Sequence, residues 1–155
     1  MATRKPLVII DGLVQQLPGG DTIDAATTEV DLVSLTNANT NAITVGQPVY
    51  VSGDGACNLA KADAIGTARV EGLVRDSSVA ASTAGSVQTD GILSSSDWTA
   101  VVGSTTLTPG DVYYLDASTA GKLTTTPPTT GYVVEVGTAI STTEIDINIQ
   151  SPIGL

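Results

Sequence analysis

The sequence predicts an all-β protein, a small antiparallel sandwich or barrel built from two related β modules, with an extended N-terminal arm and at most one or two short helical turns. Three observations carry this prediction. Apolar and polar residues alternate in short runs rich in Val, Ile, Thr and Tyr, Gly and Pro turn signals separate these runs, and no amphipathic pattern is long enough for an extended helix. The length of 155 residues suits one ordinary domain.

The expected strands are the alternating runs at residues 30–35, 49–51, 68–74, 112–115, 132–136 and 145–149. The turns between them are marked by Gly19-Gly20-Asp21, Gly53-Asp54-Gly55, Pro109-Gly110-Asp111 and Pro127-Pro128. A helical turn or two is expected at residues 96–103. There Ser96 can cap the helix, Asp97 suits its positive end and Gly103 can end it.

The chain resembles itself at an offset of about 64 residues. This shift aligns Thr44-Val45-Gly46 with Thr108-Pro109-Gly110, Tyr50-Val51 with Tyr114-Leu115, Leu59 with Leu123, and Val70-Glu71 with Val134-Glu135. Each copy is predicted to hold a turn, a strand, a hairpin and a longer strand that turns at Gly72 or Gly137. The alternative is that any two β-hairpins share Gly and alternating Val.

We therefore expect an arm at residues 1–23, a first module at 24–97 and a second module at 98–155. Each module alone is too small to bury enough surface, so the two are expected to share one core. The arm begins with basic and apolar residues that we predict to dock onto a partner: Arg4, Lys5, Pro6, Leu7, Val8, Ile9 and Ile10. The alternative for residues 7–10 is an edge strand of the chain's own sheet.

Composition excludes several classes of function. The chain has no His, so Ser-His-Asp triads and His-ligated zinc cannot form, and its single Cys57 excludes an internal disulfide and is predicted to be a small buried residue. With 6 basic and 16 acidic residues, a net charge of -10 disfavours nucleic acid and anionic membranes as partners. The longest apolar run is too short for a membrane helix or an export signal.

No group of residues predicts catalysis, a metal or a cofactor. The candidate carboxylates lie beside Gly, Pro or Thr, where Asp forms turns: Asp11, Asp21, Asp24, Asp54, Asp63, Asp111 and Asp116. The loop at residues 52–55 lacks the ligand spacing of a calcium loop, and Gly19-Gly20 lacks the pattern of a phosphate-binding loop. We therefore expect a protein that is not an enzyme.

The few aromatic residues are the natural anchors, since Phe is absent. Pro109 and Gly110 predict a type II turn, and the strand after it places Tyr113 and Tyr114 on opposite faces, one toward the core and one toward a surface or a neighbouring chain. In the alignment at an offset of 64 residues, Tyr50 corresponds to Tyr114. Trp98 is predicted to be a core or subunit-contact anchor rather than a platform for a ligand.

Several segments carry a resemblance to a known family. They are Lys5-Pro6-Leu7-Val8, Gln16-Leu17-Pro18-Gly19-Gly20-Asp21, Trp98, residues 107–115, Ala120-Gly121-Lys122-Leu123-Thr124, Gly131-Tyr132-Val133 and Val136-Gly137-Thr138-Ala139. In this order they resemble a module of tailed-bacteriophage virion proteins, found in small capsid decoration proteins and in tail or head fibres. Residues 98–153 carry the stronger match and the first 23 residues a shorter one. The resemblance implies a virion location and trimers, and it supplies no catalytic residues.

We predict a capsid decoration (cement) protein that binds the assembled lattice of the major capsid protein through the arm and stabilises it. It would be a homotrimer, made in the cytoplasm of the host bacterium and placed on the outer capsid surface. The alternative is a short tail-fibre, head-fibre or receptor-binding module of the virion. An enzyme such as a glycan depolymerase fits less well, because one Trp and four Tyr offer few platforms for sugar rings.

Overall fold

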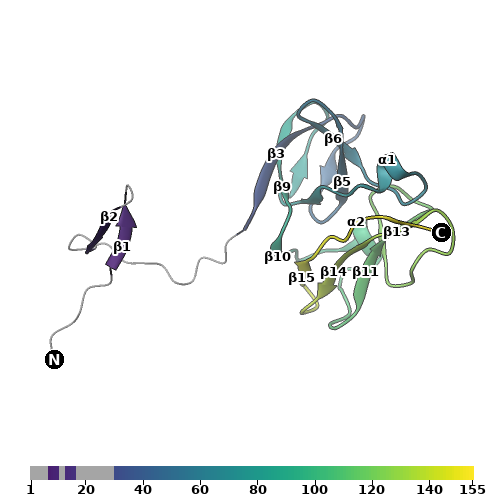
Figure 1. The fold of residues 1–155 in the computed structure, drawn as a ribbon. Coiled ribbons are helices and arrows are strands. Elements are labelled where there is room, and N and C mark those ends of the chain that lie inside the picture. The colour runs from purple at the N-terminus through teal and green to yellow at the C-terminus, as the bar shows by residue number, and fades with distance from the viewer. Residues whose placement is uncertain (1–6, 11–12, 17–29) are drawn as a thin grey trace.

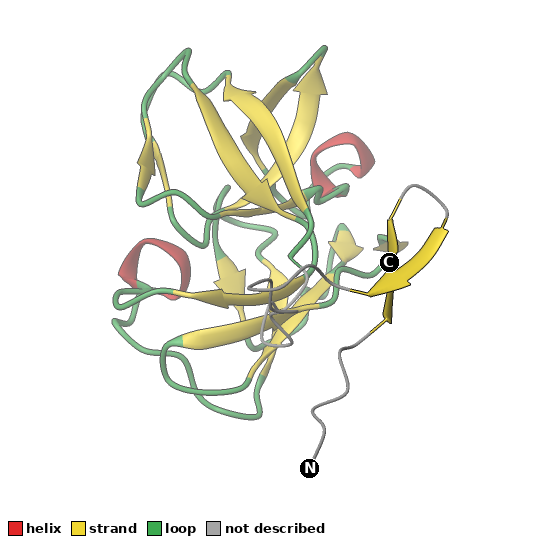
Figure 2. Ribbon diagram, turned by 90° about the vertical axis from the view of Figure 1, so that its left-hand side faces the viewer, coloured by secondary structure: helices red, strands yellow, loops and turns green. Residues whose placement is uncertain are grey.

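The computed structural model describes residues 7–10, 13–16 and 30–155, and it confirms the all-β prediction (Figure 1). Two larger sheets follow one another along the chain and are stacked in space, as Figure 2 also shows. Within the described residues, the only helices are the single turns α1 (Ile65–Ala68) and α2 (Thr99–Val102).

The first larger sheet is a closed barrel with the strand order β3-β6-β5-β7-β9. Its strands are β3 (Leu32–Asn37), β5 (Pro48–Gly53), β6 (Ala56–Leu59), β7 (Gly72–Val74) and β9 (Ala84–Gln88). All neighbours are antiparallel except β3 and β6, which close the barrel in parallel through the pairs Thr36–Ala56 and Asn37–Cys57. Inside lies a small cluster of buried residues: Leu35, Ile43, Val49, Cys57, Val74, Val79 and Val87.

The second larger sheet is open and antiparallel, with the order β10-β15-β14-β11-β12. Its strands are β10 (Gly91–Ser94), β11 (Val112–Leu115), β12 (Leu123–Thr124), β14 (Glu135–Ala139) and β15 (Glu144–Ile147). The pairing of β11 with β14 shifts register between Tyr113 and Tyr114.

Three two-stranded sheets complete the described part of the chain. β4 (Ile43–Thr44) pairs with β8 (Ser78–Val79), and β13 (Tyr132–Val133) pairs with β16 (Ile153–Gly154). β1 (Leu7–Ile10) and β2 (Leu13–Gln16) form a hairpin, and among the described strands they pair only with each other. Arg4, Lys5 and Pro6 lie outside the described residues.

The two larger sheets share one order of strands. Read from β6, the barrel runs β6-β5-β7-β9-β3, and the open sheet runs β12-β11-β14-β15-β10 in the same chain order. A tight turn precedes β5 in the first half, and a similar turn precedes β11 in the second half. The Gln47 N–H donates to the Thr44 carbonyl (3.2 Å), as the Asp111 N–H does to the Thr108 carbonyl (3.1 Å).

One hydrophobic cluster contains residues from both halves. Ala60, Ala62 and Leu73 of the first half are buried together with Trp98 and Leu115 of the second. Backbone hydrogen bonds cross the same junction, because the Ala62 N–H donates to the Asp116 carbonyl (3.0 Å) and the Ala62 carbonyl accepts from the Tyr132 N–H (2.9 Å). Strand β10 precedes residue 98 yet pairs with β15 in the second sheet.

Local details differ from the sequence expectations. The helical turn at residues 99–102 begins with the Thr99 N–H donating to the Asp97 carboxylate (2.9 Å) rather than to Ser96, and Gly103 ends it with φ 77°. The expected strand at residues 68–74 is a strand only from Gly72, because Ala68 belongs to α1. Gly72 and Gly137 lie within strands and not at turns.

Candidate interaction surface

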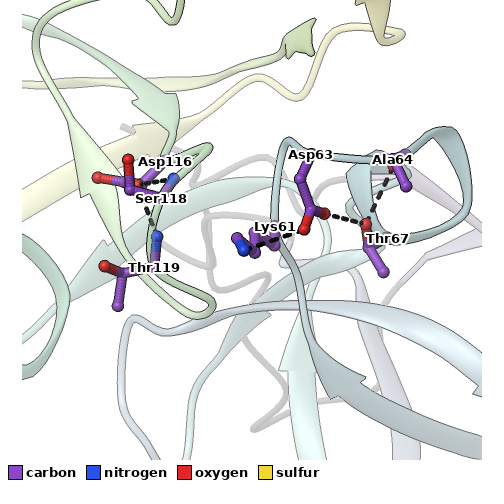
Figure 3. A network of polar contacts seen from close by, with 7 residues as sticks. All are labelled: Lys61, Asp63, Ala64, Thr67, Asp116, Ser118 and Thr119. Carbon is purple, nitrogen blue, oxygen red and sulfur yellow. Dashed lines mark hydrogen bonds and ion pairs between the residues drawn. The ribbon is translucent and has the colours of Figure 1, made fainter. Parts of the chain in front are cut away.

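Two of the candidate carboxylates, Asp63 and Asp116, hold local structure, and Asp11, Asp21 and Asp24 lie outside the described residues. The Asp63 carboxylate accepts from the Thr67 hydroxyl (3.0 Å) and forms an ion pair with Lys61 (3.0 Å), while the Asp116 carboxylate accepts from the backbone N–H groups of Ser118 and Thr119 (Figure 3). Within the described residues, no three His, Cys, Asp or Glu side chains are grouped to hold a metal ion. No described helix has the length and apolarity needed to cross a membrane.

Three side chains have shifted pKa values with clear physical causes. The pKa of Asp63 is lowered, first by the hydrogen bond from Lys61 and then by that from Thr67. The pKa of Asp97 is lowered by the Thr99 hydroxyl and by the Thr99 N–H. The pKa of the Cys57 thiol is raised by burial. The first two shifts arise from hydrogen bonds and an ion pair within a few residues along the chain, and the third arises from the small barrel core around Cys57.

Trp98 is fully buried at the junction of the two halves. Its ring packs so closely on Gly46 that a Cβ at Gly46 would lie 2.6 Å from the ring. The indole N–H donates to the Thr143 carbonyl (3.2 Å). Trp98 therefore joins the turn before β5 to the loop before β15, and it has no exposed surface for a subunit contact.

The two tyrosines of β11 have different surroundings. Tyr113 is buried, and its hydroxyl oxygen accepts a hydrogen bond from the Thr108 N–H (3.0 Å). Tyr114 is partly exposed and pairs with Thr124 of β12. Tyr50 holds the corresponding place in β5, where it is also partly exposed and packs against the larger core cluster.

A hollow of about 350 Å³ lies beside Tyr114, and Val133, Glu135 and Ile153 help to line it. β13 and β16 build one wall through the pair Val133–Ile153. Ile153 and Leu155 are 64% and 66% exposed, more than any other large apolar residue between residues 30 and 155. No sequence pattern pointed to these two residues, although an apolar residue after Pro152 is the signal that could have found β16.

The remaining candidate surface is the arm. Of the arm residues predicted to dock, Leu7, Val8, Ile9 and Ile10 form β1, which pairs with β2 in the register Leu7–Gln16 to Ile10–Leu13. The hairpin has two outer edges, one on β1 and one on β2, that no described strand occupies.

No protein-family model matches the chain, and no curated protein matches it in sequence.

Proposed function

We propose that the protein is a virion structural protein of a tailed bacteriophage, a capsid decoration (cement) protein that binds the assembled lattice of the major capsid protein. The observation that carries the proposal is the β1–β2 hairpin, whose strands pair with no other described strand. An isolated two-stranded hairpin is at best marginally stable in water, so it gains most from a third strand supplied by a partner. The segments that resemble virion modules favour the capsid as this partner.

Strand addition supplies the contact. A capsid strand placed at the outer edge of β1 continues the ladder with main-chain hydrogen bonds. The sequence of β1 is Leu-Val-Ile-Ile, and a continuous apolar run of this kind is typical of strands that are covered on both faces. Arg4 and Lys5 precede it and supply two of the six basic residues in this acidic chain.

Stabilisation of the shell then follows from mass action. A protein that binds the assembled lattice and not the free capsid subunit lowers the free energy of the assembled state by its own binding free energy. Because a lattice offers many equivalent sites, the contributions add over the shell. We propose a homotrimer as the binding unit, made in the host cytoplasm and placed on the outer capsid surface.

A second candidate is a short tail-fibre or head-fibre module that binds a receptor. The hollow beside Tyr114 favours it, because a partly exposed tyrosine with apolar neighbours and a few polar groups is typical of a ligand site. The net charge of -10 suits either virion role, since it limits unspecific aggregation of surplus subunits.

The number of copies per virion tests the proposal. Virions of the phage that encodes the chain are purified and separated on a gel, and the 15.6 kDa band is quantified against the major capsid protein. A fixed ratio to the capsid subunit, with hundreds of copies, is expected of a protein that covers the lattice. A few dozen copies or fewer would overturn the decoration role in favour of the fibre, and absence from the virion would overturn both.

A further inference from the structure

We propose that the open edge of β10 receives strand β2 from the arm of a second copy of the chain, so that neighbouring subunits exchange hairpins. This proposal goes beyond the decoration role, since it requires no capsid. It leaves the outer edge of β1 free for another partner, because β2 alone contacts β10.

The register of the second sheet shows which backbone groups of β10 are free. The Ser95 N–H donates to the Thr143 carbonyl (2.9 Å). In an antiparallel pair every second residue bonds to the same neighbouring strand, so Leu93 and Gly91 also direct their N–H and C=O groups toward β15. Ile92 and Ser94 lie between them, and their N–H and C=O groups point away from β15. No described strand pairs with that side of β10.

A groove of about 190 Å³ runs beside this edge, lined by Arg75, Gln88, Ile92, Leu93 and Ser94. Ile92 is 40% exposed, and burying it under an added strand is favourable. Arg75 is exposed and forms no ion pair with the described residues. The other edge of the sheet differs, because α2 packs against β12 and Lys122 Nζ donates to the Thr99 carbonyl (3.2 Å).

The arm joins the described body beside this edge. The Asp31 carbonyl accepts from the Thr89 N–H (2.9 Å), two residues before β10 begins at Gly91. Leu32 pairs with Gln88, which lines the groove, and Leu32 is itself 49% exposed. The residues between β2 and Val30 number about 13, and such a length spans up to roughly 45 Å when extended. The hairpin can therefore reach a neighbouring subunit.

We assign the strand that pairs with β10 to a second copy of the chain, because the outer edges of β2 and β10 are both unpaired within one chain. Within the described residues of a single chain, β2 has an open edge and β10 has an open edge, and the two do not pair. Exchange between copies satisfies both edges. It is a head-to-tail contact, which closes into a ring when the rotation between subunits permits, and a trimer is one such ring.

Ser94→Pro tests the edge. Proline removes the Ser94 N–H, which the proposal needs for β2, and breaks no backbone hydrogen bond to β15, so the fold should persist as judged by circular dichroism. It also removes the hydrogen bond from the Ser94 hydroxyl to the Glu144 carboxylate (3.3 Å), which the control Ser94→Ala removes as well. The mass in solution is expected to fall from a multiple of 15.6 kDa to 15.6 kDa, while the control Ser94→Ala keeps the oligomer. A monomeric natural chain, or a folded Ser94→Pro variant that stays oligomeric, would overturn the proposal.

Disulfide trapping identifies the occupant even if Ser94→Pro fails to fold. Ile92→Cys is combined in turn with Leu13→Cys, Val14→Cys, Gln15→Cys or Gln16→Cys, which together are the four residues of β2. At least one pair is expected to give covalent oligomers on a non-reducing gel, whereas Val51→Cys on the barrel, in place of Ile92→Cys, gives none. A disulfide within one chain, or no disulfide in any of the four pairs, would contradict exchange between copies.

Discussion

Gly72 in β7 lies directly against the backbone of Gln88 in β9, so that a Cβ on Gly72 would be 2.3 Å from the Gln88 carbonyl oxygen. The second half repeats this relation. A Cβ on Gly137 in β14 would be 2.3 Å from the carbonyl oxygen of Asp146 in β15. The two glycines also pair with corresponding residues, Gly72 with Val49 and Gly137 with Tyr113. Each sheet thus has a point where two strands approach more closely than side chains allow.

We predict that Gly72→Ala and Gly137→Ala each lower the free energy of unfolding by about 1–3 kcal/mol, because the methyl group meets backbone that cannot rotate away. Urea unfolding measures the change. Gly66→Ala is the matched control, since a Cβ there has no neighbour within 4 Å and Ala favours the helical turn α1. Equal losses in all three variants would contradict the close approach as the cause.

The two halves are predicted to unfold together. The larger core cluster takes residues from both halves, and Trp98 packs between them. Trp98 is the single tryptophan, so its fluorescence reports on this junction, while far-ultraviolet circular dichroism reports on all strands. Urea curves from the two signals should coincide. Separate midpoints would show that the halves are independent folding units.

The Cys57 thiol is predicted to react slowly with a disulfide reagent at neutral pH. It is only 3% exposed, and burial raises its pKa, so little reactive thiolate is present. The absorbance of the released reagent measures the rate. In a denaturing concentration of urea the same thiol should react completely within the mixing time of a manual assay, and equally fast reaction of the folded protein would contradict the burial of Cys57.

Asp63 should contribute to the pH dependence of stability. Its pKa in the folded state is lowered below its ordinary value of 3.8, so its stabilising contribution is present above that value and is lost as the pH falls through the lower folded-state pKa. Asp63→Asn should therefore lower the free energy of unfolding slightly near neutral pH and have no effect in strong acid. Asp54→Asn makes the same change in net charge without the bonds to Lys61 and Thr67. A titration of the Asp63 carboxyl by NMR that gives an ordinary or raised pKa would contradict the prediction.

Removal of residues 2–12 should abolish attachment to the virion while leaving a folded β protein. The deletion takes away β1, which supplies the edge proposed for the capsid strand, and it does not touch residues 30–155. Copies per virion are counted on a gel, and circular dichroism checks the fold. A variant without residues 2–3 keeps every residue predicted to dock and should retain its occupancy. Full occupancy by the longer deletion would refute the docking role of the arm.

The sequence predicted those local features that depend on a strong conformational preference of a residue, such as a turn glycine or a β-branched or aromatic strand residue. The run 112–115 matches β11, and the turn glycines Gly46 and Gly110 have φ of 80° and 86°, as the aligned Thr-x-Gly segments require. The run 132–136 was expected to be one strand, but it contains β13 and the start of β14. β13 pairs with β16, whereas β14 pairs with β11 and β15, and a local sequence pattern does not reveal partners so distant in the chain.

The interaction surfaces were less accessible to sequence reasoning. The arm could be identified from its basic and apolar start, but the open edge of β10 depends on the register with β15, which only the folded sheet defines. The residues 91–94 are too few for a reliable alternation. Likewise, composition alone predicted that Trp98 lies either in a core or in a subunit contact. Its packing on Gly46 in the structure places it in the core.

The parallel closure of β3 on β6 sets how many strands each subunit can accept. Two residue pairs, Thr36–Ala56 and Asn37–Cys57, are enough to remove the edges of the first sheet, while the second sheet, with the same strand order, keeps β10 open. At the other end of the second sheet α2 packs against β12, so β10 is the one edge of the larger sheets that we propose to accept a strand. Units with one donor and one acceptor form rings or linear chains and cannot branch, so the barrel closure protects the surplus protein from growing into a network.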